Sequence, residues 1–164
     1  MIKLLHVEDD PDIRELAELA LVMTGEFELA QCETGEAALE WVKDATPDII
    51  LLDMMMPGLT GVETLREMRK LPHLASVPAA FMTARAEISE LGDLSTLGAT
   101  DVIAKPFDPL ELPALIKAIL GKARRSALGV LPIWRERPQD QRQKCSRLLR
   151  PRAAGTQTQS HQAG

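Results

Sequence analysis

The stretch LLDMMMPGLTG, residues 51–61, decides the fold of this chain. Upstream it continues as DIILLD (residues 48–53), whose unbroken apolar run favours a central strand covered on both faces. Asp53 stands where this strand leaves the core, and three methionines, a proline and two glycines follow it. Either Asp53 merely caps the strand end, or the strand presents its carboxylate for chemistry.

Length and composition favour a globular protein. The 164 residues suffice for one ordinary domain with some left over, and hydrophobic residues make up 45% of them. No apolar run approaches the ~18 residues of a membrane span, and the start MIKLLHV lacks the features of a signal peptide. The distant Cys32 and Cys145 match no metal spacing and fit reduced thiols. We therefore expect a cytoplasmic protein without membrane partners.

The net charge of −5 hides a division within the chain. Residues 1–121 carry a net charge of −13, whereas residues 122–164 carry +8. The second segment is rich in Arg and Gln and has no hydrophobic periodicity, which is typical of disorder. We predict a globular domain over residues 1–121 and a basic, polar, largely disordered tail over residues 122–164.

Within residues 1–121, short apolar runs alternate with segments of helical periodicity. The predicted strands span residues 2–7, 27–32, 48–53, 77–83 and 101–105. The predicted helices span residues 11–23, 35–45, 61–71, 86–98 and 108–120, with Asp10–Pro11 and Asp108–Pro109 as starts for the first and last. Five strands, each followed by a helix, predict an α/β fold with a parallel sheet covered on both faces.

Polar residues stand at the ends of four predicted strands, the edge where such sheets bind ligands. These residues are Glu8, Asp9, Asp53, Thr83 and Lys105. Each alone has an ordinary explanation as a turn, cap or solvated side chain, and the three methionines fit core and loop packing. Their joint placement indicates a single site.

These groups suit phosphoryl transfer with Mg²⁺. Clustered carboxylates attract a hard dication, and Mg²⁺ takes oxygen ligands while it keeps several waters. An aspartate can attack phosphorus and form an acyl phosphate. The phosphoryl oxygens then need positive charge and hydrogen-bond donors, which Mg²⁺, Lys105 and Thr83 could supply.

Four segments, LLHVEDDPDIREL, PDIILLDMMMPGLTGVETL, FMTARA and IAKPFDP, carry a resemblance to a known family. In this order and spacing they resemble the receiver domain of bacterial two-component response regulators, over residues 1 to 121. The resemblance implies a flavodoxin-like fold, a doubly wound five-stranded parallel sheet of order 2-1-3-4-5 with five helices. We interpret the chain as a stand-alone receiver similar to chemotaxis regulators, a phosphorelay protein and not an enzyme.

The resemblance also implies a role for each matching residue. Asp53 would take a phosphoryl group from a sensor histidine kinase or a phosphotransfer protein. The implied Mg²⁺ ligands are Glu8, Asp9, Asp53 and the backbone carbonyl of Met55. The implied phosphoryl-binding and switch residues are Thr83, Ala84, Lys105 and Val102. The residues implied to shape the loops are Pro57, Gly61 and Pro106, with Pro106 after a cis peptide bond.

Two features depart from the family pattern. Receiver domains usually carry an aromatic residue three positions before the lysine, where this chain has Val102, a β-branched residue with little rotamer freedom. We therefore expect the signalling output to use the loop after Thr83 and the fourth predicted helix, over residues 86–98. Residues 122–164 lack helix-turn-helix patterning, so we expect output through protein contacts. The expected partners are an unknown downstream protein and a second copy in a homodimer.

Three other functions stay open at this point. The ten Lys and Arg residues of the tail favour nucleic-acid binding, although the tail has one aromatic residue and no recognised motif. The second alternative is a phosphatase with an aspartyl nucleophile. Such enzymes commonly place a second aspartate two residues after the first, and the methionine at position 55 argues against this function. A receiver that acts only as a scaffold would need no phosphorylation.

Overall fold

The apolar run before Asp53 forms the central strand of the sheet. The computed structural model describes residues 1–84, 88 and 94–128. Strand β3 (Ile49–Asp53) is buried at all five positions and pairs with β1 (Ile2–Val7) and β4 (Ala79–Ala84). By its internal packing the chain divides into two units, Met1–Val130 and Leu131–Gly164.

All pairings in the sheet are parallel, as the alternation of strands and helices predicts. Strand β2 (Phe27–Cys32) lies beside β1, and β5 (Asp101–Lys105) lies beside β4. The resulting order is β2-β1-β3-β4-β5, which confirms the predicted topology. Because the strands are parallel, their carboxyl ends share one edge, and Asp53 is the register partner of Met82 there.

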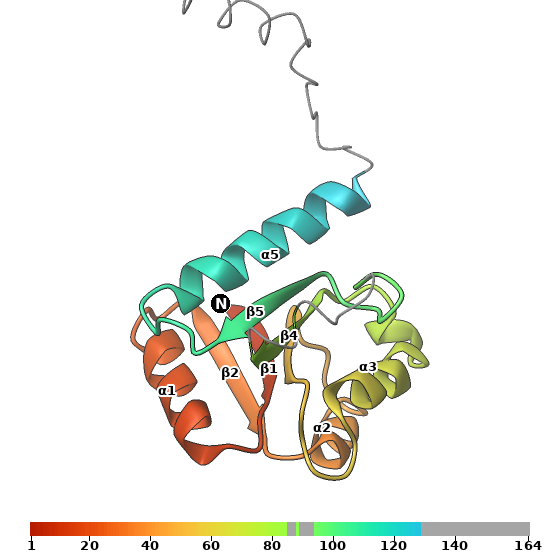
Figure 1. The fold of residues 1–164 in the computed structure, drawn as a ribbon. Helices are drawn as coiled ribbons and strands as arrows, with labels where there is room; N and C mark the ends of the chain where they lie inside the picture. Colours follow the sequence, from red (N-terminus) through yellow and green to blue (C-terminus); the bar gives the residue numbers. More distant parts are fainter. Residues whose placement is uncertain (85–87, 89–93, 129–164) are drawn as a thin grey trace, which may run out of the picture. The chain divides into compact units, whose positions relative to one another are not determined.

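The helices connect the strands and cover both faces of the sheet (Figure 1). They are α1 (Pro11–Val22), α2 (Gly35–Trp41), α3 (Gly61–Arg69), the short 3₁₀ helix η1 (Pro72–Leu74) and α5 (Leu112–Ala127). The helix predicted over residues 86–98 lies largely outside the described residues. Among the helices that the structure does describe, none has the length and apolar content to cross a membrane.

Two apolar cores lie on opposite faces of the sheet. The first, here named the α1/α5 core, packs alternate strand residues such as Leu51 and Met82 against Leu21 and Ile116. The second, the α2/α3 core, packs the intervening strand residues such as Leu52 and Phe81 against Leu65. Because strand side chains alternate between the two faces, β3 supplies both cores, which explains why all its residues before Asp53 are apolar.

Side-chain caps define where two helices begin, close to the carboxyl edge of the sheet. The Asp10 carboxylate accepts from the backbone N–H groups of Asp12 and Ile13, which confirms the predicted start of α1. Thr60 and Glu63 form a reciprocal capping box at the start of α3. The caps stabilise the starts of the helices that come after β1 and β3 along the chain.

The last helix differs from its prediction at both ends. It begins at Leu112 and not at Asp108, because Asp108 Oδ1 accepts from the N–H of Leu110 at 2.9 Å and folds the intervening residues into a turn. A second proline, Pro113, stands in the first turn of α5, where its missing N–H costs nothing. The helix continues to Ala127 and crosses residue 121, where the sequence predicts the end of the domain. That boundary stays a prediction.

The burial of β3 predicts the cost of removing its side chains. Leu51 is fully buried, so Leu51→Ala should lower the free energy of unfolding by about 2–5 kcal/mol through lost apolar burial and a residual cavity. Leu19 on α1 is 55% exposed, and Leu19→Ala should change the free energy by no more than about 0.5 kcal/mol. Urea unfolding of the three proteins checks both values. Equal effects of the two substitutions would contradict the central position of β3.

Candidate phosphoacceptor site

Three carboxylates meet at the carboxyl edge of the sheet. Glu8 and Asp9 follow the last residue of β1, and Asp53 is the last residue of β3. One oxygen from each of Glu8, Asp9 and Asp53 lies within 4.8 Å of the others. Glu8 and Asp53 are buried, and Asp9 is the most accessible of the three. An oxygen-only donor set of this kind suits a hard divalent cation such as Mg²⁺.

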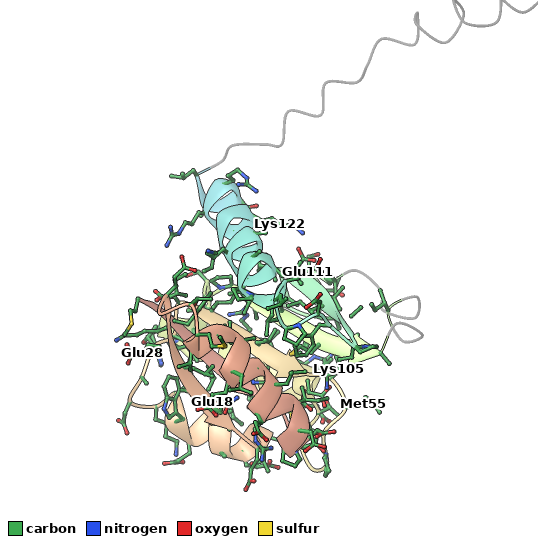
Figure 2. The ribbon with its side chains drawn as sticks, turned by 90° about the vertical axis from the view of Figure 1, so that its left-hand side faces the viewer. Glu18, Glu28, Met55, Lys105, Glu111 and Lys122 are labelled. Atoms are coloured by element: carbon green, nitrogen blue, oxygen red, sulfur yellow. The ribbon has the colours of Figure 1, made fainter. Side chains whose placement is uncertain are left out.

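Lys105, the last residue of β5, reaches this cluster from two strands away. Its Nζ lies 2.7 Å from Glu8 Oε2 and 3.0 Å from Asp53 Oδ1. Figure 2 shows that Lys105 and Met55 leave the ribbon in the same region of the domain. The sheet order makes this contact geometrically available because β1, β3 and β5 all end at one edge.

The electrostatics of the cluster are set by burial and by Lys105. Burial raises the pKa of both Glu8 and Asp53, and the Lys105 ammonium opposes this by favouring their charged forms. Burial alone would lower the pKa of Lys105, but its contacts with Glu8 and Asp53 outweigh burial and raise it. The ammonium therefore stays charged at neutral pH and holds negative charge in a buried place.

The loop after β3 approaches Asp53 through glycine. A Cβ at Gly61 would lie 2.1 Å from the backbone oxygen of Asp53, so only glycine lets the start of α3 come this close. The N–H of Gly61 donates to the Met54 oxygen at 3.1 Å, and the N–H of Met55 donates to Asp53 Oδ1 at 3.4 Å. Pro57 and Gly58, with φ of 76° at Gly58, form the exposed turn of this loop. The loop thus wraps closely around the acidic residue.

The structure brings the other predicted site residues to this edge, with one exception. Thr83 is 1% exposed near the end of β4, and Ala84 is the exposed register partner of Lys105. The peptide bond between Lys105 and Pro106 is cis. The exception is Val102, which is half-buried and packs against the α2/α3 core, away from the carboxylates.

Comparison with known protein families shows which family this chain belongs to. Residues 4–117 match the family model of the response regulator receiver domain. This chain belongs to that family. The acidic cluster and the lysine therefore lie at the carboxyl edge of the sheet in a receiver domain.

Known proteins resemble this receiver in both sequence and fold. It is 38% identical over 126 residues to the phosphate regulon transcriptional regulatory protein PhoB of Pseudomonas aeruginosa, which covers 77% of this chain and 53% of that protein. A putative response regulator from Chloroflexus aurantiacus has a TM-score of 0.67 and 34% identity, over 73% of this chain and 98% of that chain. The chain spans about half the length of the curated relatives it matches.

A second similar structure bears on the metal site. The receiver domain of the sensor histidine kinase PA1611 from Pseudomonas aeruginosa has a TM-score of 0.66 and 28% identity, over 73% of this chain and 98% of that chain. It is described as carrying a magnesium ion coordinated in its active-site cleft.

Arg14 supports the receiver site but carries no motif that singles it out. Its Nη1 donates to the backbone oxygens of Glu8 at 2.7 Å and Asp9 at 2.9 Å, which fixes the turn between β1 and α1. A cation in the first turn of a helix opposes the helix dipole, so a further contact is needed to explain it. The position of this positive charge near the start of a predicted helix was the feature of the sequence that could have identified Arg14 as a supporting residue.

His6 is the second supporting residue that sequence reasoning missed. It is fully buried in β1, and its Nδ1 accepts from Gln31 Nε2 at 3.3 Å, so the neutral ring carries its proton on Nε2. Among the described residues, Nε2 has no hydrogen-bond partner. Burial, followed by the positive charges of Lys105 and Arg14, lowers the pKa of His6 to about 4. The ring is therefore neutral in the folded receiver.

The close approach of Gly61 to Asp53 predicts that a methyl group added at position 61 destabilises the domain. Gly61→Ala would place a Cβ against the Asp53 backbone and displace the loop, at a cost of about 1–3 kcal/mol in the free energy of unfolding. Gly25→Ala is the contrasting variant, because no atom lies within 4 Å of its Cβ position and only its φ of 64° strains it. Gly61→Ala should lower the unfolding temperature more than Gly25→Ala does, and thermal unfolding of both variants checks this. A Gly61→Ala protein as stable as the parent would contradict the close approach.

The buried His6 predicts a loss of stability in mild acid. In the unfolded chain the His6 ring is protonated near pH 6.5, whereas in the folded chain it is protonated only near pH 4. The contribution of the neutral ring to the free energy of unfolding is therefore fully present above pH 6.5 and is lost as the pH drops towards 4. Between pH 7 and pH 5 the free energy of unfolding of the parent protein should fall by about 2 kcal/mol more than that of His6→Leu, because leucine cannot be protonated. Urea unfolding at both pH values measures the difference. Parallel pH curves for the two proteins would refute the assignment.

Proposed function

We propose that this receiver is the phosphoacceptor of a two-component signalling system. In this proposal Asp53 takes a phosphoryl group from a histidine of a sensor kinase or a phosphotransfer protein, the partners with which receiver domains interact. The observation that carries the proposal is the placement of Asp53. It ends the central strand, is 6% exposed, and contacts the Lys105 ammonium beside two further carboxylates.

In this proposal the two oxygens of Asp53 have different tasks, which their contacts support. The Lys105 ammonium and the Met55 N–H both contact Oδ1, which leaves Oδ2 as the better nucleophile. Oδ2 forms a bond to phosphorus as the bond between phosphorus and the donor imidazole nitrogen breaks. The imidazole keeps that electron pair and takes up a proton. The product is an acyl phosphate on Asp53 and a free histidine on the donor.

The donor set of this chain fits Mg²⁺. Three carboxylates and one ammonium leave the cluster with an excess of negative charge, and all its donor atoms are oxygens. Glu8, Asp9, Asp53 and the Met55 carbonyl would hold the ion. When bound, it would offset the negative charge of the phosphoryl oxygens. The magnesium ion described for the PA1611 receiver domain supports this part of the proposal.

Lys105 and Thr83 would serve the phosphoryl group after transfer. Glu8 holds the Lys105 ammonium at 2.7 Å, so the ammonium can exchange its contact with Asp53 for a phosphoryl oxygen without leaving the site. The Thr83 hydroxyl, buried near the end of the adjacent strand, would donate to another phosphoryl oxygen. Both residues act by binding charge and neither forms a covalent bond.

The added phosphoryl group would act as a conformational signal. It brings about −1.5 to −2 charge into a confined site and would shift an equilibrium between two conformations. Val102 lacks the aromatic ring that usually marks this switch, so we infer that output uses the backbone after Thr83. The receiver would then act, in the cytoplasm, on an unidentified protein or a second copy of itself, without catalysing turnover of its own.

Intact mass spectrometry tests the phosphoacceptor role. The parent protein, incubated with acetyl phosphate, should gain one phosphoryl group in the presence of Mg²⁺ and little in its absence. Asp53→Asn should gain none, because the amide lacks the nucleophilic oxygen. Asp44→Asn removes the same charge at an exposed position and should react like the parent.

Two results would count against this role. Equal phosphorylation of Asp53→Asn and the parent protein would show that another residue accepts the group. No gain in the parent, from acetyl phosphate or from a phosphorylated histidine phosphotransfer protein, would favour a scaffold that works without phosphorylation.

A further inference from the structure

The three methionines after Asp53 have different surroundings. Met56 is 6% exposed and belongs to the α2/α3 core, and Met54 is half-buried against the same core. Met55 instead exposes 65% of its surface. Packing therefore explains two of the three side chains and leaves the exposed thioether of Met55 without an explanation.

Met55 is bound by its backbone to the phosphoacceptor residue. Its N–H donates to Asp53 Oδ1 at 3.4 Å, so covalent geometry keeps its sulfur within about 9 Å of that oxygen. Figure 2 places Met55 in the same region as Lys105. An exposed, polarisable sulfur thus stands at the rim of a buried anionic site.

We propose that Met55 is an oxidation site through which peroxides reduce the phosphoacceptor activity of this receiver. The proposal rests on the proposed function of Asp53. In the reaction, the sulfur lone pair attacks one oxygen of the peroxide, the oxygen–oxygen bond breaks and a sulfur–oxygen bond forms. The thioether is oxidised to a sulfoxide, and hydrogen peroxide is reduced to water.

Exposure limits this oxidation to the methionines that face solvent, of which Met55 is one. Met68 and Met82 are fully buried and Met56 nearly so, which protects them from a dissolved oxidant. Met1 and Met23 are 82% and 84% exposed and should also react. Met23 follows the end of α1, which runs away from the site edge, so its oxidation serves as an internal control.

The sulfoxide changes the chemistry at the rim of the site. It replaces an apolar surface with an oxygen that accepts hydrogen bonds and carries partial negative charge. Phosphoryl donors are anions, and the three carboxylates of the site outnumber its one ammonium, so the negative end of the sulfoxide dipole at the entrance opposes their approach. We expect the rate of Asp53 phosphorylation to fall roughly threefold or more, the scale of a modest change in electrostatic attraction at a cleft.

The change should be reversible. Methionine sulfoxide reductases remove the oxygen as water while two thiols become a disulfide, which restores the thioether. A cycle of oxidation and reduction at Met55 would couple the redox state of the surroundings to the signalling capacity of this receiver.

The test compares the parent protein with Met55→Leu and Met23→Leu. Each is treated with hydrogen peroxide, then with catalase and a dithiol, which reverses reversible thiol oxidation but leaves sulfoxides in place. Peptide mass spectrometry locates the sulfoxides. The rate of phosphorylation by acetyl phosphate and Mg²⁺ is then measured by intact mass, and each protein is compared with its own untreated sample.

The parent protein and Met23→Leu should lose roughly threefold or more of their own rate, and reductase treatment should restore it. Met55→Leu should keep its own rate. An unreactive Met55, a Met55 sulfoxide with an unchanged rate, or an equal loss in Met55→Leu would each overturn the proposal. If the untreated parent protein accepts no phosphoryl group, the proposed function fails first, and that outcome is visible before any peroxide is added.

Discussion

The contact of one ammonium with two buried carboxylates constrains the whole domain. Lys105 lies 2.7 Å from Glu8 and 3.0 Å from Asp53, and both acids are almost inaccessible to water. A buried charge without a partner is expensive, so the acids can stay ionised here only if a cation is held beside them. The three residues come from the ends of β1, β3 and β5, which makes the sheet order a requirement of the site.

Backbone contacts keep this charged group in place. Arg14 holds the turn that carries Glu8 and Asp9, and Gly61 lets the start of α3 lie directly against Asp53. The loop between β3 and α3 therefore lies close against Asp53 while its Met55 side chain faces solvent. A strand end held in this way, with an accessible rim, supports the proposed role of Asp53, in which a partner protein would reach it and transfer a phosphoryl group.

Strand patterns predicted a parallel sheet with Asp53 at the end of a buried strand, because an unbroken apolar run favours a strand covered on both faces. The order of the strands was predicted from the family resemblance and not from these patterns. The start of α5 was predicted wrongly, since Asp108 caps a turn and not the helix. Arg14 and His6 were missed for a different reason. Their contacts are with backbone carbonyls and with a neighbouring strand, and such contacts leave no periodicity or motif in the sequence.

We propose that Glu8, Asp9 and Asp53 form one site for a divalent cation, with Asp53 also serving as the phosphoacceptor. Calorimetric titration with Mg²⁺ tests it most directly, using the parent protein, Asp9→Asn and Glu18→Gln, an exposed acid on α1 with the same loss of charge. The account predicts one Mg²⁺ per chain in the parent and in Glu18→Gln, and an affinity about tenfold or more weaker in Asp9→Asn, as expected when a charged ligand is lost. Equal binding by Asp9→Asn and the parent protein would contradict it.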